Sequence, residues 1–342
     1  MFVRRAFGLV MLLALGCAPP PAPERARSVS PPIHSAVASV SVVPSPSPSP
    51  LVAEVIAPPK PAAVSVTEAE RVLFLGQTPA DVTTACGAVT PDEERIRCLI
   101  GRRYDGDQVA VKLALDLYAR SGDVAGLQKP EMFDGGYRGM IELVPELPTG
   151  KFRQHLAWVE EGTRDFDTVY SALKGHYRWR ALTLRFFRSV KRTTPNGFAR
   201  DWSYAYNVSG SLLHSATAVR ELMVHEIFHL NDETHGDWSS KTLAKIQAEV
   251  IKKCGKSTTC LAPYAPNDTI VKGGTYYAFH ADNGPWEYAA ELAVRHFNEQ
   301  RTALRKEKVQ KPFKCGPAPN GTAWKLFVDE FWSGVDLVPP CP

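Results

Sequence analysis

The residues best suited to chemistry in this chain lie in one short run, 224–230, which reads Val-His-Glu-Ile-Phe-His-Leu. It contains the pattern H-E-x-x-H, in which two histidines stand four positions apart. Positions i and i+4 share one face of an α-helix, so His225 and His229 can direct their imidazoles at a single ion. Glu226 would lie beside that ion, where a carboxylate can accept a proton from water. The pattern therefore predicts a zinc (Zn2+) site with Glu226 as general base.

The residues before this motif favour the helix that it requires. The run 216–224 contains neither Pro nor Gly, and Ser215 is a suitable N-cap. Leu222, Ile227 and Leu230 would give the helix an apolar side that can pack on a core. The alternative interpretation is a surface helix that carries two histidines by chance.

A catalytic zinc ion takes three protein ligands and a water molecule, and the sequence offers two candidates for the third ligand. His235 stands six residues after His229, the spacing of the metzincin pattern H-E-x-x-H-x-x-G-x-x-H. That pattern has a glycine where this chain has Asp232. It also requires a methionine turn downstream, whereas Met223 is the last methionine of the chain. Both departures argue against His235, which stays open as the alternative ligand.

The second candidate is Glu287, within the run 285–293 that looks like the start of a helix. Pro285 suits the first turn of such a helix. Glu287 and Glu291 would share one face, so that one can bind zinc while the other accepts a hydrogen bond from a ligating histidine. A surface helix with two solvated glutamates is the competing interpretation.

Taken together, the two runs resemble a known family over residues 225–291. The chain has H-E-x-x-H-x-x-D followed by E-Y-A-A-E, and gluzincin metallopeptidases such as the catalytic domain of anthrax lethal factor have H-E-x-x-H-x-x-D followed by E-[FY]-x-A-E on a later helix. The resemblance implies that the zinc ligands are His225, His229 and Glu287. It also implies that Glu226 is the general base and that Asp232 and Glu291 support the ligands.

One position departs from that family. The resemblance implies a tyrosine seven residues before the ligand glutamate, where it can stabilise the oxyanion of the transition state. This chain has His280 at that position, with Tyr276 and Tyr277 nearby. We therefore expect either His280 or a nearby tyrosine to supply that catalytic hydrogen bond. Tyr277 is the tyrosine that we name as the candidate.

The elements around the motif predict an α+β fold. Runs 140–144, 177–190 and 202–213 are expected to be strands and 151–174 a helix. In zinc peptidases of this type an antiparallel edge strand precedes the metal helix and binds substrate by strand addition. We therefore expect a zincin-like catalytic domain over residues 132–342, with a small mixed sheet, preceded by a helical subdomain over 65–131.

The N-terminal part of the chain predicts export. Residues 1–17 have a basic start and a short apolar core, and they end at Cys17 in a sequence that resembles a bacterial lipobox. An ordinary secretory signal is the alternative. Residues 18–64 hold thirteen of the 28 prolines, which favours an extended, disordered linker. These features predict a lipid anchor on Cys17 and an outer-membrane, periplasmic or cell-surface location.

The cysteines and the charge add two expectations. Six cysteines remain beyond Cys17, and an even number in an exported chain predicts disulfides. Neighbour pairing is our prediction among the 15 connectivities that six cysteines allow. No C-x-x-C spacing occurs, which argues against a cysteine zinc site. The net charge of +4 is mild and no basic run is concentrated, which gives no case for nucleic acid.

The sequence thus predicts an exported, membrane-anchored zinc-dependent endopeptidase that acts on protein or peptide substrates. Two alternatives stay open. One is a metzincin-type protease that uses His235, and the other is a non-enzymatic or inactive zinc-binding surface lipoprotein.

Overall fold

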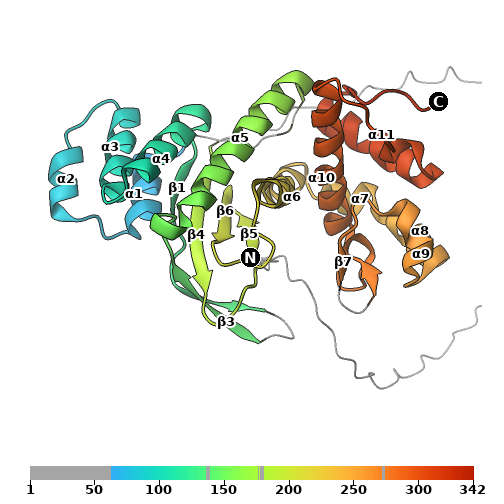
Figure 1. Ribbon diagram of the computed structural model, residues 1–342, viewed down its shortest axis with the longest axis horizontal. Helices are drawn as coiled ribbons and strands as arrows, with labels where there is room; N and C mark the ends of the chain where they lie inside the picture. The colour runs from blue at the N-terminus through green and yellow to red at the C-terminus, as the bar shows by residue number, and fades with distance from the viewer. Residues whose placement is uncertain (1–62, 136–138, 176, 178–180, 272–273) are drawn as a thin grey trace, which may run out of the picture. The chain divides into compact units, whose positions relative to one another are not determined.

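A computed structural model describes residues 63–342 except 136–138, 176, 178–180 and 272–273. The predicted signal segment, Cys17 and nearly all of the linker lie outside these residues. The described part is a mixed α+β structure, as expected, with one curled sheet and helices around it (Figure 1). Within the described part, none of the helices combines the length and the apolar composition needed to cross a membrane.

The region from 65 to 121 is helical, as predicted. One of its helices begins at Asp92, directly after Pro91, which is the N-cap. The helical prediction fails at its C-terminal end, where Val124–Leu127 forms β1 and pairs in parallel with β4. The four helices of this region are α1 (Val66–Phe74), α2 (Ala80–Cys86), α3 (Asp92–Tyr104) and α4 (Gln108–Ser121).

The main sheet is mixed, with strand order β2-β3-β4-β6-β5 and β1 paired to β4 off this path. β4 is its central strand, parallel to β1 and β6 and antiparallel to β3. The strand predicted at 140–144 is confirmed as β3. The strand predicted at 177–190 is present as β4, which is shorter than predicted. The strands after β1 are β2 (Glu131–Asp134), β3 (Met140–Pro145), β4 (Thr183–Ser189), β5 (Gly197–Arg200) and β6 (Ser203–Asn207).

The edge strand near the metal helix is β5, one strand earlier than predicted. The expected strand 202–213 ends at Asn207, and it is an internal strand because β4 and β5 pair with its two sides. Asp201 and Trp202 form the hairpin turn with φ of 50° and 51°, the left-handed conformation that a tight two-residue hairpin requires. Neither is a glycine, so the sequence carried no signal for this turn.

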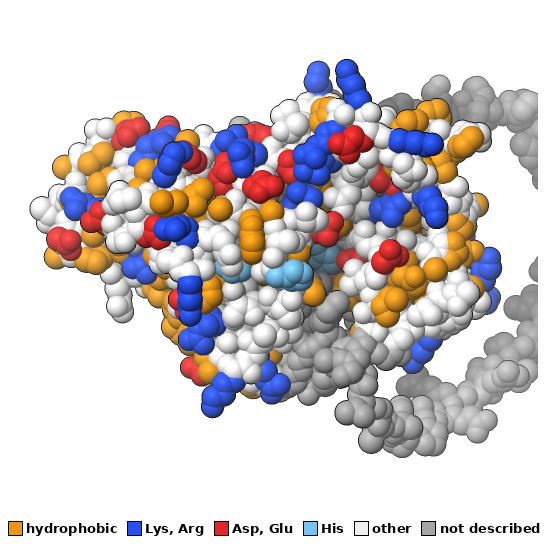
Figure 2. Space-filling model, in the orientation of Figure 1, with side chains coloured by type: hydrophobic (Ala, Val, Ile, Leu, Met, Phe, Trp, Pro, Cys, Tyr) orange, Lys and Arg blue, Asp and Glu red, His pale blue; other side chains and the backbone are white. Residues whose placement is uncertain are grey.

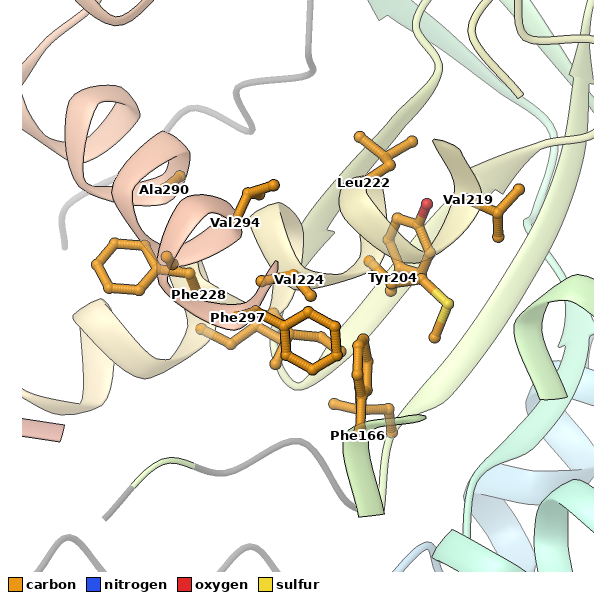
Figure 3. Close-up of a cluster of buried hydrophobic side chains, with 14 of the residues drawn as sticks. Phe166, Tyr204, Val219, Leu222, Val224, Phe228, Ala290, Val294 and Phe297 are labelled. Atoms are coloured by element: carbon orange, nitrogen blue, oxygen red, sulfur yellow. The ribbon is translucent and has the colours of Figure 1, made fainter. Parts of the chain in front are cut away.

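The helices that complete the fold pack around α6. α6 packs against α5 and α10, and α5 also packs against α4. Figure 3 shows Val224 and Phe228 of α6 in one apolar cluster with Phe297 of α10, and all three are at most 1% exposed. The longer helices are α5 (Arg153–Leu173), α6 (Ala216–Thr234), α8 (Ala244–Cys254), α10 (Pro285–Leu304) and α11 (Ala318–Trp332). The shorter elements are α7 (Trp238–Thr242), α9 (Thr258–Leu261), β7 (Ile270–Val271) and β8 (Thr275–Tyr276).

Three disulfides confirm the predicted neighbour pairing. Each closes a short loop, with sequence separations of 12, 6 and 26 residues. The first ties α2 to α3, the second ties α8 to α9, and the third fastens the C-terminal segment to the residues before α11. The pairs are Cys86–Cys98, Cys254–Cys260 and Cys315–Cys341.

Candidate metal centre

Helix α6 carries the H-E-x-x-H motif in a fixed orientation. The Ser215 hydroxyl accepts a hydrogen bond from the Ala218 N–H, so the predicted N-cap is confirmed. Val224 and Phe228 are buried in the core, which fixes the rotation of the helix about its axis. The rings of His225 and His229 then face the same region, with their centroids 4.9 Å apart.

Glu287 of α10 meets both histidines. Its Oε2 atom lies 3.0 Å from Nε2 of His225 and 3.7 Å from Nε2 of His229. The three ligand atoms of this group all lie within 4.8 Å of one another. Two imidazole nitrogens and one carboxylate oxygen form a donor set typical of a zinc site with an open fourth position. This triad of His225, His229 and Glu287 is a candidate metal centre.

Glu291 supports the triad from one helical turn further along α10. Its Oε1 atom lies 3.4 Å from Nδ1 of His225, the ring nitrogen that does not face Glu287. Its Oε2 atom accepts a hydrogen bond of 3.1 Å from the Asn267 side chain. This geometry matches the prediction that one glutamate belongs to the ligand group while the other contacts a ligating histidine.

Glu226 is buried beside the triad, with 1% of its surface exposed. The backbone N–H of Ala199 in the edge strand β5 donates a hydrogen bond to its carboxylate. Its Oε2 atom has no hydrogen-bond partner among the described residues. Burial raises the pKa of Glu226 to about 7, against the smaller opposing effect of the His225 and His229 charges. The motif therefore places a basic carboxylate with one available oxygen next to the candidate metal ligands.

The charges of the triad stabilise each other. Burial alone would lower the pKa of His225, but its hydrogen bonds to Glu287 and Glu291 raise that pKa to about 10. Burial would raise the pKa of Glu287, whereas the charge of His229 and the hydrogen bond from His225 hold it well below its usual range. Protons and a metal cation would bind to the same nitrogen and oxygen atoms of this triad, so the two are expected to compete.

The structure separates the two candidates for the catalytic hydrogen bond. Tyr277 is buried, its hydroxyl donates to Glu287, and its ring centroid lies 6.1 Å from that of His225. Burial raises the pKa of Tyr277 well above its ordinary value, so the hydroxyl remains a donor. His280 instead accepts a hydrogen bond of 3.3 Å at Nδ1 from the N–H of Asp282. Tyr277 is therefore the residue that adjoins the triad.

Asp232 and His235 are engaged elsewhere. Both carboxylate oxygens of Asp232 accept hydrogen bonds from Ser239, at 2.7 Å and 2.6 Å, which fixes the chain where it leaves α6. His235 places Nδ1 2.6 Å from Oε1 of Glu330, and its ring packs on Phe331. Among the described residues, the group able to hold a metal contains Glu287 and not His235. The structure thus favours Glu287 over His235 as the third member of the candidate ligand group.

A cavity of about 520 Å³ adjoins the triad and was not predicted. His225 and Glu291 form part of its wall. The rest comes from the N-terminal half of α6, from residues 267–270, and from Leu212, His214, Tyr277 and Val294. Figure 2 shows histidine side chains at the surface near the middle of the face drawn there. No sequence signal marked Asn267, Asp268 or Ala199, because each joins the site through a contact with a residue distant in sequence.

Comparison with known proteins returned no match, whether to family models, to curated proteins or to solved structures. The resemblance to gluzincins therefore rests on the motif residues and on the geometry into which the fold brings them. That geometry includes the two histidines, a glutamate 62 positions from the first of them, and a buried carboxylate between α6 and the edge strand.

Proposed function

We propose that this protein is a zinc-dependent endopeptidase with a zincin-like catalytic domain of the gluzincin type. The observation that carries the proposal is the triad of His225, His229 and Glu287, with the Glu226 carboxylate buried beside it. The donor set fits zinc, and Glu291 at Nδ1 of His225 supplies the outer contact that such ligands require. A purely structural site has no use for a base at this position.

Bound zinc would act as a Lewis acid toward a water molecule and a peptide carbonyl. Glu226 would accept the proton from that water, since its Oε2 atom is buried and available. The Ala199 N–H would hold the carboxylate in place during the transfer. Tyr277 would donate a hydrogen bond to the oxyanion that develops on the carbonyl.

The edge strand β5 supports a peptide as the substrate. Its register pairs Gly197 with Tyr206 and Arg200 with Ser203 of β6, which leaves the other edge of β5 toward the catalytic residues. An extended peptide can add to such an edge through main-chain hydrogen bonds. A side chain at Gly197 would meet the Tyr204 ring at 2.7 Å and the Ala205 carbonyl oxygen at 2.9 Å, so only glycine lets the hairpin close here.

Export and anchoring complete the proposal. The signal-like segment ending in Cys17 would place a lipid-anchored enzyme outside the cytoplasm, at the outer membrane, in the periplasm or at the cell surface. Three disulfides fit an oxidising compartment. Residues 18–64 would hold the catalytic domain at a distance from the anchor.

The test compares zinc content and peptide hydrolysis in the full chain purified in detergent. Wild type should hold one zinc ion by elemental analysis, and Glu287→Ala should lose it. Glu226→Gln should keep the zinc and lose hydrolysis of a mixed peptide library. Glu249→Gln, an exposed carboxylate on α8, should change neither quantity. Hydrolysis retained by Glu226→Gln would refute the mechanism, and zinc retained by Glu287→Ala would refute the ligand set.

A further inference from the structure

The cavity beside the triad has walls of two kinds. Leu212, Leu222, Ile270 and Val294 supply an apolar surface, and His225 makes the end next to the metal centre. Its volume of about 520 Å³ lies within the range of roughly 300–1,000 Å³ typical of sites that bind small groups. A substrate bound at the metal centre would therefore have room for one long side chain in this cavity.

The polar part of the wall holds the carboxylates of Glu221, Asp268 and Glu291, together with His214, Asn267, Thr269 and Tyr277. Glu221 and Asp268 both line the cavity, and no Lys or Arg does so among the described residues. Neither carboxylate forms a salt bridge with another described residue. Arg220, the cation adjacent to Glu221 in sequence, is buried and turned to Asp165 at 3.0 Å. Among the described residues no Lys or Arg side chain therefore neutralises these carboxylates, which share the wall with the imidazole of His214.

The Glu221 carboxylate is held by α10, and the backbone of Asp268 is held through its two neighbours in sequence. Glu221 lies one helical turn before His225, and its Oε1 atom accepts a hydrogen bond of 2.9 Å from Asn298 of α10. Asp268 lies between two anchored residues. Asn267 donates to the Glu291 carbonyl at 2.8 Å, and the Thr269 carbonyl accepts from the Tyr277 N–H at 2.7 Å. The positions of the acidic groups are thus coupled to the residues that support the metal centre.

We propose that this cavity binds a lysine or arginine side chain of the substrate next to the bond that is cleaved. The inference rests on the proposed function, since it takes the triad as the place where the peptide bond lies. The aliphatic part of such a side chain would pack on Leu222 and Val294, while its charged end reached Glu221 and Asp268. An apolar side chain of equal length would fill the same space but give neither carboxylate a cationic partner.

The test measures binding separately from hydrolysis. The probes are the hydroxamates of N-acetyl-lysine and N-acetyl-norleucine, which differ at the side-chain terminus, where lysine carries an ammonium group and norleucine does not. Their dissociation constants are measured on the zinc-loaded full chain by calorimetry. A hydrogen bond to a charged group is worth about 1.5–3 kcal/mol, so we expect the lysine compound to bind roughly tenfold or more tightly.

The variant Glu221→Gln/Asp268→Asn keeps the shape of the cavity and removes its charge. It should bind the two hydroxamates about equally, with its zinc content and melting temperature unchanged, whereas Glu249→Gln should keep the wild-type preference. Equal binding by wild type, or a lysine preference that persists in the double variant, would overturn the inference. A lysine preference in a protein that cleaves no peptide would support the cavity and refute the proposed peptidase. Cleavage at sites without Lys or Arg would support the proposed peptidase and refute the assignment of the cavity.

Discussion

Glu291 Oε1 lies 3.4 Å from Nδ1 of His225, while the Nε2 atom of the same ring lies 3.0 Å from Glu287. The imidazole is therefore held at both nitrogens by two carboxylates one helical turn apart on α10. This relationship fixes the ring orientation and directs Nε2 of His225 toward the other two members of the candidate metal centre. It also makes Glu291 a positioning residue whose contribution can be measured apart from that of the ligands.

Replacement of Glu291 by glutamine should weaken zinc binding without removing it. The neutral amide keeps the shape of the side chain but no longer increases the basicity of His225, and such outer contacts are typically worth roughly 10–100-fold in metal affinity. Competition with a chromophoric chelator measures the change. Glu249→Gln is the matched control, and an affinity equal to wild type would show that Glu291 has no such role.

Zinc binding should release protons and weaken in acid. The carboxylates around His225 raise its pKa to about 10, so below that pH the metal-free site holds a proton that zinc must displace. Affinity should therefore fall as the pH falls, by about tenfold per pH unit for each proton released. Calorimetry at one pH in buffers of different ionisation enthalpy counts these protons. A binding enthalpy independent of the buffer would contradict the prediction.

Substitution of Tyr277 by phenylalanine should lower kcat and leave the zinc content unchanged. The hydroxyl adjoins the ligand carboxylate of Glu287, and loss of one oxyanion donor costs on the order of a hundredfold or more in rate. His280→Ala is the internal control, because the hydrogen bond at its ring is with Asp282. The assignment is reversed if His280→Ala loses activity while Tyr277→Phe keeps it.

The folded protein should lose stability in acid partly through His296. Burial lowers the pKa of this histidine to about 3, and its ring is 1% exposed and stacked on Trp332. Because the folded-state pKa is depressed, the unfolded chain binds the proton first, and stability falls as the pH decreases from about 6.5 toward 3. One pKa unit corresponds to about 1.4 kcal/mol, so this group should cost about 3 kcal/mol at pH 4.5.

His296→Phe isolates that contribution. Denaturant unfolding at pH 7 and pH 4.5 should show a smaller difference in unfolding free energy for the variant than for wild type. Other buried groups titrate equally in both proteins and cancel in the comparison. An identical difference in the two proteins would mean that His296 is already protonated in the folded state or is not buried when neutral.

Local sequence was enough to predict the helix of the H-E-x-x-H motif, its Ser215 cap and the helix that starts at Pro285. Caps, proline positions and the i, i+4 spacing act within one or two helical turns, so they operate before any tertiary contact forms. The disulfides were also predictable, since each joins cysteines that are neighbours along the chain.

Tertiary structure alone decided which residues complete the site. Glu287 lies 62 positions after His225, and only the packing of α10 on α6 brings its carboxylate to the two histidines. His235, by contrast, contacts Glu330. The same packing places Tyr277 beside the triad and forms the cavity next to it. The edge strand was misplaced because the turn at Asp201 and Trp202 has no glycine. Long-range packing, which no local pattern encodes, determined each of these outcomes.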